Sequence, residues 1–130
     1  MGRSQVYEPE ARMTREAYRA WVAQRPSGRY ERVGGVVVAM APERAVHALR
    51  KAAARDALLR EVRQKGLPCQ VFPDGMTIEV GDNDYEPDAV LRCGARLPDH
   101  SIAVPDPLII VEVLSPATSR GRARWRRGRS

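Results

Sequence analysis

The sequence predicts an α/β protein in which a mixed β-sheet is flanked by helices. One observation is the Ala-rich segment 42–66, which has the length and composition of a long helix. The other is a set of short runs rich in Val and Ile on both sides of it, which are typical of strands. Helical and strand-forming segments therefore follow one another along the chain, and this order favours a sheet with at least one long helix packed on it.

The first part of the chain is predicted to form a helix followed by a hairpin. Thr14 is suited to cap the N-terminus of a helix that runs to about Gln24. The segment "RYERVGGVVVAM", residues 29–40, has strand formers on both sides of Gly34 and Gly35. Because a two-residue turn of the primed type needs residues with positive φ, the glycine pair predicts a β-hairpin.

The long helix is expected to begin near Pro42 and to end at Gly66, so that it has about 22 residues and is ~33 Å long. Its side chains form two mostly apolar stripes: Val46, Leu49, Ala53 and Ala57 in the first, and His47, Ala54, Leu58 and Val62 in the second. A helix with two such stripes is expected to be covered on more than one side.

Four further strands are expected after the long helix. "CQVF" and "MTIEV" flank the turn residues 73–75 and predict a second hairpin. "GDNDYE" is expected to be a loop in which Asp82 and Asp84 are solvated, and it leads to the strand "PDAVLR". The last run, "LIIVEVL" at 108–114, is apolar at nearly every position and predicts a central strand covered on both faces.

The net charge of +6 comes from the C-terminal tail. Residues 120–130 contain six arginines and no acid; without them the 22 basic residues of the chain fall to 16, which equals the number of acidic residues. We therefore expect one domain over residues 13–119, a flexible N-terminus over 1–12 and a disordered tail. An alternative for the tail is non-specific binding to the phosphates of a nucleic acid.

The composition also indicates the cellular location of the protein and the redox state of its cysteines. No run approaches 18 apolar residues, and the N-terminus lacks the apolar core of a signal peptide, so we expect a cytoplasmic protein without a membrane span. Reduced thiols are then the expectation for Cys69 and Cys93, although a disulfide between them stays open. Since the chain has no CxxC pair, a structural zinc site is not expected.

Two acids stand where strands are expected. Asp88 follows Pro87 at the start of a strand, and Glu112 interrupts the apolar run "IIVEVL". A carboxylate in a sheet is costly unless it is solvated, paired or bound to a cation. If the two strands are neighbours, both carboxylates could bind one divalent cation such as Mg²⁺, whose protein ligands are commonly one or two carboxylates. The alternative, stronger for Asp88, is an exposed or edge-strand acid.

From about Met13 to Arg120 the chain resembles the Uma-two (Uma2) family of restriction-endonuclease-like proteins, within the PD-(D/E)XK nuclease superfamily. The resemblance lies in "RYERVGGVVVAMAP", the helix that bears His47, "GLPCQVFPDGMTIEV", "YEPDAVL" and "DPLIIVEVLSPATSR". It implies a Mg²⁺- or Mn²⁺-dependent enzyme that cleaves phosphodiester bonds of DNA. Asp88 matches the Asp of the PD element, Glu112 the following acid, and Glu31 the acid contributed from before the long helix.

The chain departs from the family pattern at the lysine. Two positions after the second acid, where the superfamily has lysine, stands Leu114. The family places its lysine in a helix further on, but here the chain runs into the Arg-rich tail, so we expect the C-terminal part of the fold to be missing. Lys51 is a candidate substitute or a solvated surface residue, and His47 either faces the metal pocket or lies on the helix surface.

Two functions follow from the sequence. The first is a metal-dependent endonuclease in which Asp88 and Glu112 hold the metal and Glu31 completes the site. The alternative is an inactive, truncated remnant of that fold that acts at most as a nucleic-acid-binding or interaction module. A sheet left open by a missing C-terminal part would need cover, so a homodimer is expected.

Overall fold

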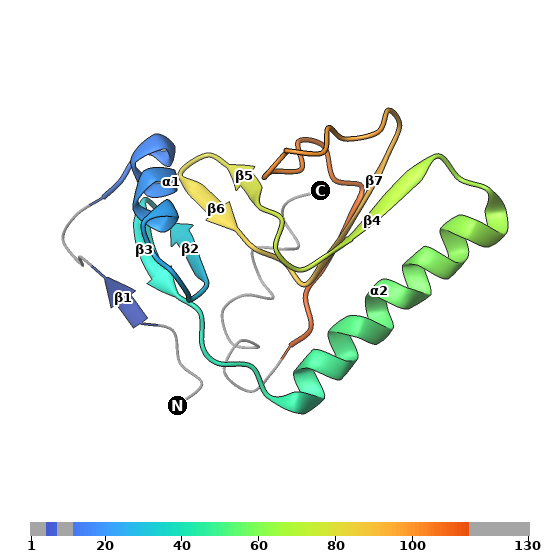
Figure 1. Ribbon diagram of the computed structural model, residues 1–130, viewed down its shortest axis with the longest axis horizontal. Coiled ribbons are helices and arrows are strands. Elements are labelled where there is room, and N and C mark those ends of the chain that lie inside the picture. The colour runs from blue at the N-terminus through green and yellow to red at the C-terminus, as the bar shows by residue number, and fades with distance from the viewer. Residues whose placement is uncertain (1–4, 8–11, 115–130) are drawn as a thin grey trace.

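The computed structural model describes residues 5–7 and 12–114, and in this part of the chain two helices and eight strands form an α/β fold (Figure 1). The helices are α1 (Arg15–Ala23) and α2 (Ala45–Lys65). The strands are β1 (Gln5–Tyr7), β2 (Tyr30–Val33), β3 (Val36–Ala39), β4 (Cys69–Pro73), β5 (Ile78–Val80), β6 (Asn83–Tyr85), β7 (Ala89–Cys93) and β8 (Ile109–Val111). The predicted α/β class is confirmed. In place of one mixed sheet, the described strands form two sheets in which neighbouring strands are antiparallel.

Local signals in the first part of the chain act as predicted. The Thr14 hydroxyl accepts a hydrogen bond from the backbone N–H of Ala17 at 3.1 Å and so caps α1. Gly34 and Gly35 have φ angles of 59° and 86°, which close the β2–β3 hairpin with a turn that other residues rarely adopt. Both predictions are confirmed. They could be made from the sequence because each depends on residues that are close together along the chain.

The five-stranded sheet has the order β1-β3-β2-β6-β5 and joins the first hairpin to a second one. Its edge strand β1 lies in the segment 1–12 that we expected to be flexible. The two hairpins meet where Arg32 of β2 pairs with Asp84 of β6. The sheet therefore connects residues that are about fifty positions apart in the sequence.

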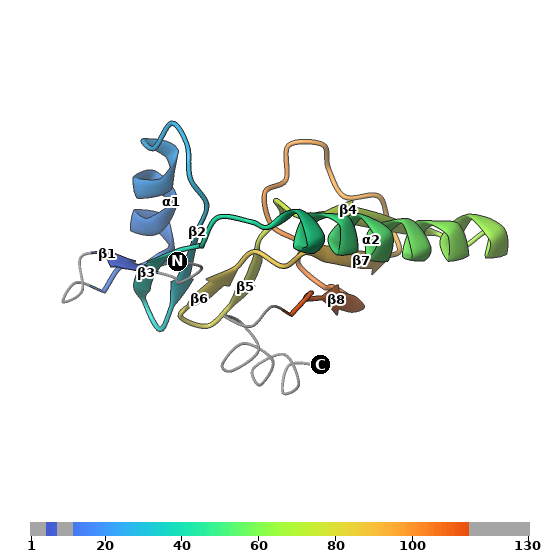
Figure 2. The same ribbon diagram turned by 90° about the horizontal axis from the view of Figure 1, so that it is seen from below.

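The three-stranded sheet has the order β4-β7-β8 and carries α2 on one face (Figure 2). Successive side chains of β7 enter different cores, because side chains of a strand alternate between its two faces. Leu91 packs with Val62 of α2 and Val71 of β4. Val90, which is fully buried, packs with Ile78, Leu97 and Val104 instead. Both faces of β7 are thus apolar, as the run "AVL" requires.

The predicted hairpin between "CQVF" and "MTIEV" is wrong. β4 pairs with β7, and β5 pairs with β6. The segment expected to be a loop supplies β6, and Gly81, with φ 55°, closes a two-residue turn between β5 and β6. That turn is tighter than the one at residues 73–75, so β5 finds its partner on its C-terminal side.

The long helix begins and ends close to the predicted residues, but fewer of its sides are packed against other elements than predicted. It ends at Gly66, whose φ of 61° gives the left-handed cap. Only the second stripe packs, with Val62 buried, whereas Val46 and Leu49 of the first stripe are 51% and 71% exposed. The expectation of cover on more than one side is therefore wrong for this part of the chain: among the described strands, β4 and β7 of the three-stranded sheet pack against α2.

The strand β8 is also less covered than predicted. Among the residues that the structure describes, it pairs with β7 alone and is the last strand of its sheet. Leu108, Ile109 and Leu114 are 69%, 41% and 45% exposed. The prediction of a central strand covered on both faces is wrong for residues 108–114. The predicted tail at 120–130 lies outside the described residues.

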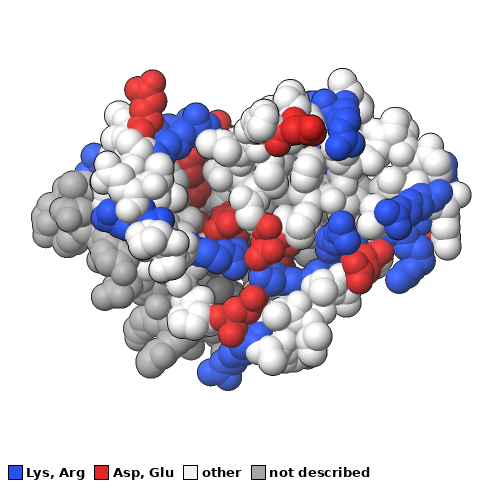
Figure 3. All heavy atoms as spheres, viewed as in Figure 1, with Lys and Arg blue, Asp and Glu red and all other residues white. Residues whose placement is uncertain are grey.

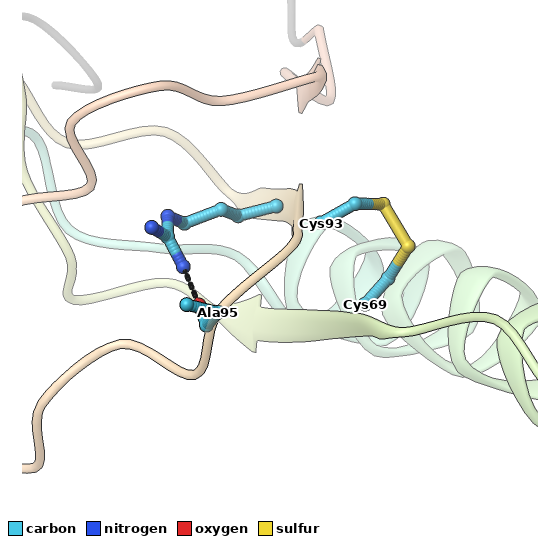
Figure 4. Close-up of a disulfide and its surroundings, with 4 residues drawn as sticks. Cys69, Cys93 and Ala95 are labelled. Carbon is cyan, nitrogen blue, oxygen red and sulfur yellow. Dashed lines mark hydrogen bonds between the residues drawn. A yellow bond between two sulfur atoms is a disulfide. The ribbon is translucent and has the colours of Figure 1, made fainter.

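A disulfide joins Cys69 of β4 to Cys93 of β7 (Figure 4). The antiparallel register sets the two residues opposite each other, with their Cα atoms 3.9 Å apart. Reduced thiols were expected for a cytoplasmic protein, and a disulfide between these two cysteines, 24 positions apart, was the alternative left open. That expectation is contradicted, since strand pairing alone creates the contact.

Candidate active site

Asp88 lies one residue before β7, where it is held between two strands. It is 5% exposed, and its Oδ2 accepts the backbone N–H of Val113 at 2.6 Å. Its own N–H donates to the carbonyl of Val111 at 3.0 Å. Pro87 and Asp88 break the stretch "YEPDAVL" into β6 and β7, because proline cannot donate to a ladder. The sequence alternative of an exposed acid is thus wrong for Asp88.

Glu112 lies one residue after β8, and β8 pairs antiparallel with β7 so that Ala89 stands opposite Val111. Asp88 and Glu112 therefore occupy the same end of this strand pair. The two strands that these acids adjoin are neighbours, as expected, although each acid lies one residue outside its strand. Glu112 is partly exposed. Whether both carboxylates share an ion stays a prediction.

His47 of α2 reaches this end of the strand pair. Its Nε2 is 3.0 Å from the carbonyl oxygen of Val113 and 3.6 Å from Oδ2 of Asp88. Its Nδ1 is 2.8 Å from Oε2 of Glu43. A carbonyl and a carboxylate only accept, so a ring nitrogen of His47 that carries a proton donates to the oxygen beside it. His47 therefore faces the candidate site and not only the helix surface.

Lys51, one turn further along α2, is not the solvated surface residue that the sequence left open. Its side chain is 10% exposed, and its ammonium donates to Asp74 at 2.8 Å and also contacts Glu43. Burial alone would lower the pKa of Lys51, but the hydrogen bonds to Asp74 and Glu43 outweigh it and the pKa is raised. The ammonium group is thus a fixed cation within the protein.

Glu31 of β2 is 4% exposed and lies next to the segment that leads to Asp88. Its Oε2 accepts the backbone N–H of Glu86 at 2.8 Å. Burial raises the pKa of Glu86, the nearby charge of Glu31 raises it further, and Arg29 opposes this rise. Glu31 thus fixes the backbone two residues before Asp88.

These residues form one connected set of charges, which we call the charge belt: Glu31, Glu86, Arg29, Asp74, Lys51, Glu43, His47 and Asp88. Asp74 joins its two halves, because Arg29 and Lys51 both contact its Oδ2, at 3.3 and 2.8 Å. Figure 3 shows acidic and basic side chains adjoining in the middle of the face that Figure 1 presents. The belt contains more carboxylates than cationic side chains, which favours an added cation.

Part of the charge belt had a sequence signal that could have revealed it. Glu43, His47 and Lys51 are spaced four residues apart, and such residues adjoin on one face of a helix. No sequence signal indicated the contact between Arg29 and Glu86, since they are 57 positions apart and are brought together by the five-stranded sheet. Asp74 was assigned to the turn alone.

The candidate ligands Asp88 and Glu112 suit a divalent cation that needs few protein ligands, and not a metal site built from three or more protein side chains. Within residues 5–7 and 12–114, no group of three or more His, Cys, Asp or Glu side chains lies close enough to hold a metal. Mg²⁺ needs only one or two carboxylates, because water completes its shell. Asp88 and Glu112 can supply that number.

Two antiparallel sheets, a long helix and two acids at one end of adjacent strands are consistent with a restriction-endonuclease-like protein. The chain belongs to the Uma2 family: the model of this family, described as "putative restriction endonuclease", matches residues 15–127. Comparison with curated proteins and with solved structures gave no match. None of the described helices is long and apolar enough to cross a membrane.

Proposed function

We propose that this chain is a Mg²⁺- or Mn²⁺-dependent endonuclease that hydrolyses phosphodiester bonds of DNA. Membership of the Uma2 family supports nuclease chemistry. The observation that carries the proposal is the position of Asp88 and Glu112 at one end of the β7–β8 pair, with Asp88 buried beside His47. In this proposal the two acids hold the metal and Glu31 is the third acid of the site.

The bound metal would supply an activated water and neutralise charge on the phosphate. The chain contributes the positions of the ligands. Asp88 is held by the N–H of Val113, and His47 holds the carbonyl of that same residue. Glu31 holds the N–H of Glu86, which orients the segment that enters β7. Asp88 and Glu31 are therefore each held by a backbone N–H, which limits their motion when phosphate binds.

His47, and not Lys51, is the basic side chain that we assign to the neighbourhood of Asp88. Its Nε2 is 3.6 Å from Oδ2 of that aspartate. The contacts of Lys51 are with Glu43 and Asp74, so its charge is already compensated by two carboxylates. In this proposal the imidazole of His47 lies beside the phosphate that the acids act on, and Lys51 does not.

Metal-linked stability and DNA cleavage test the proposal. The Tm of the protein should rise with MgCl₂ or MnCl₂, because a ligand that binds only the folded state stabilises it. Asp88→Asn and Glu112→Gln should each abolish this rise and any nicking of supercoiled plasmid. Asp99→Asn is the matched control, since that aspartate is 81% exposed on its side chain. A rise in Tm that survives both site substitutions would overturn the metal assignment.

The alternative is a chain that binds nucleic acid or another molecule and cuts nothing. The observation that favours it is Leu114, which occupies the lysine position of the superfamily pattern and is 45% exposed. In that case plasmid would be retarded in a gel at low salt but would stay intact with Mn²⁺. Introducing Leu114→Lys should then create or increase nicking, whereas the same substitution at exposed Leu67 should not.

A homodimer is part of the proposal because apolar side chains on β8 and on the first stripe of α2 are exposed. Leu49 and Leu108 are the most exposed of these. Light scattering of the chain after size-exclusion chromatography should give twice the mass of one chain. Leu108→Glu should shift the mass toward the monomer, and a wild-type monomer at high concentration would contradict the expectation.

A further inference from the structure

A cavity of about 290 Å³ opens beside the charge belt, on the side of α1. Tyr18, Val22 and Ala23 of α1 form one wall, and Tyr30 of β2 contributes to its lining. The charged lining includes Arg29 and Glu86. Cavities that hold drug-sized ligands begin at about 300 Å³, so this one suits a single small group.

Arg29 lines this cavity, and one of its nitrogens has no hydrogen-bond partner in the described part of the chain. Its Nε donates to Oε1 of Glu86 at 3.3 Å, and its Nη1 contacts Oδ2 of Asp74 at 3.3 Å. The remaining nitrogen, Nη2, is buried and has no hydrogen-bond partner in the described part of the chain. A buried donor without an acceptor is costly. A small shift of the Arg29 side chain, which is 35% exposed, would bring this donor to a ligand oxygen in the cavity and remove that cost.

The lining thus combines an apolar, aromatic wall with one donor group and one carboxylate side by side. Enzymes that extrude a base from DNA bind it in this way, between aromatic or apolar side chains and with hydrogen bonds to its edge. Guanine offers an acceptor, O6, next to two donor groups, N1–H and N2–H₂. The acceptor suits Arg29, and the donors suit the carboxylate of Glu86.

We propose that this cavity binds a guanine base of the DNA substrate, turned out of the duplex next to the bond that is cut. The inference rests on the proposed nuclease function, because Glu86 precedes Asp88 by only two residues and Glu31 bonds to its backbone. A base in the cavity would therefore be close in the chain to the candidate metal ligands. The cavity selects the base, and the acids act on the phosphate beside it.

The binding test uses the full chain without metal and the four deoxynucleoside monophosphates, titrated by calorimetry. All four share the sugar and the phosphate, so a difference in affinity reports on the base. We expect dGMP to bind about tenfold more tightly than dAMP, dCMP or dTMP, as one well-paired base edge provides. Equal affinity for all four, or no binding at millimolar concentration, would overturn the proposal.

Two substitutions in α1 test whether the cavity is the site. Ala23→Leu adds bulk to a residue that lines it and should weaken dGMP binding at least tenfold. Ala20→Leu makes the same change at another exposed alanine of α1 and should leave binding unchanged. If both variants bind dGMP as the wild type does, the base binds elsewhere and the proposal fails.

Glu86→Gln tests the selectivity without changing the shape of the side chain. The amide loses one acceptor and gains a donor, which suits adenine better than guanine. The preference for dGMP over dAMP should fall at least tenfold, while a retained preference would contradict the assignment. Selective binding of dGMP without plasmid cleavage would support the guanine site and overturn the proposed nuclease function. Plasmid cleavage without selective binding of dGMP would support the nuclease function and overturn the guanine site.

Discussion

Asp84 and Asp88 are four residues apart, and their side chains are 2% and 6% exposed, yet their surroundings differ. Asp84 accepts from two guanidinium groups, Arg32 at 2.5 Å and Arg15 at 2.8 Å. Asp88 accepts one backbone N–H, and His47 is 3.6 Å away. The charge of Asp84 is thus compensated twice within the protein, whereas Asp88 retains the capacity to bind a cation.

The comparison teaches that burial alone does not distinguish a structural acid from a candidate catalytic one. The sequence suggested the opposite assignment for Asp84, which was expected to be solvated in a loop. In the structure Asp84 joins α1 to both hairpins of the five-stranded sheet, through Arg15 and Arg32. What separates the two acids is the number of cations that already contact each carboxylate.

The largest expected effect is on Asp84. Asp84→Asn keeps the shape of the side chain but leaves Arg32, which is 2% exposed, without its counter-charge. Breaking a buried pair in this way costs about 3–5 kcal/mol of unfolding free energy. Urea unfolding followed by circular dichroism measures this loss, and Asp99→Asn serves as the exposed control. A loss below about 1 kcal/mol would mean that the Arg32–Asp84 pair is not structural.

Asp88→Asn should behave differently when metal is absent. The amide oxygen can still accept the N–H of Val113, so the free energy of unfolding should change by less than about 1 kcal/mol. With Mg²⁺ at a hundred times its dissociation constant, the wild type should gain about 2.7 kcal/mol and the variant nothing. A metal-free loss as large as that of Asp84→Asn would make Asp88 a second structural acid and remove the contrast.

His47 sharpens the contrast because it contacts the residue that holds Asp88. His47→Ala removes the donor to the carbonyl of Val113 and should cost about 1 kcal/mol of stability. His47→Gln retains a donor and should recover part of this loss. The measurement is again urea unfolding, repeated with Mn²⁺. If neither variant alters stability or metal-linked stabilisation, the imidazole is not part of the support of Asp88.

The smallest expected effect is the acid sensitivity of the charge belt. Burial alone would raise the pKa values of Glu43 and Asp74, but hydrogen bonds and charge from Lys51 lower both. A carboxyl whose pKa is lower in the folded protein contributes stability that is present above its unfolded pKa and is lost as the pH falls through the folded value. Stability should therefore fall below about pH 4.

Lys51→Met should make this loss shallower, because the cation that lowers both pKa values is gone. Lys65→Met is the matched control: the Lys65–Glu61 pair at 2.7 Å is exposed, and salt at about 0.15 M screens it. Unfolding free energies from pH 3 to 7 provide the comparison. Identical pH profiles for the two variants would show that the contacts of Lys51 contribute no more than a surface pair.

The elements with local signals followed from the sequence by itself. The cap at Thr14, the turn at Gly34 and Gly35 and the end of α2 at Gly66 each depend on hydrogen bonds or dihedral angles within a few residues. The acids Asp88 and Glu112 were also selected as candidates from the sequence, because a charge at the start of a strand or within an apolar run is costly. That the chain is an α/β protein of the Uma2 family needed no coordinates.

Only the tertiary structure decided which strands pair and what each buried charge contacts. The register of β4 on β7 joins Cys69 to Cys93, and the meeting of two hairpins sets Arg32 on Asp84, across 52 positions of sequence. Lys51 became a buried cation in the same way, because a turn 23 residues away brings Asp74 to it. Such contacts depend on the packing of distant segments, for which a local sequence pattern carries no information, since the loops between them can close in many ways at similar entropic cost.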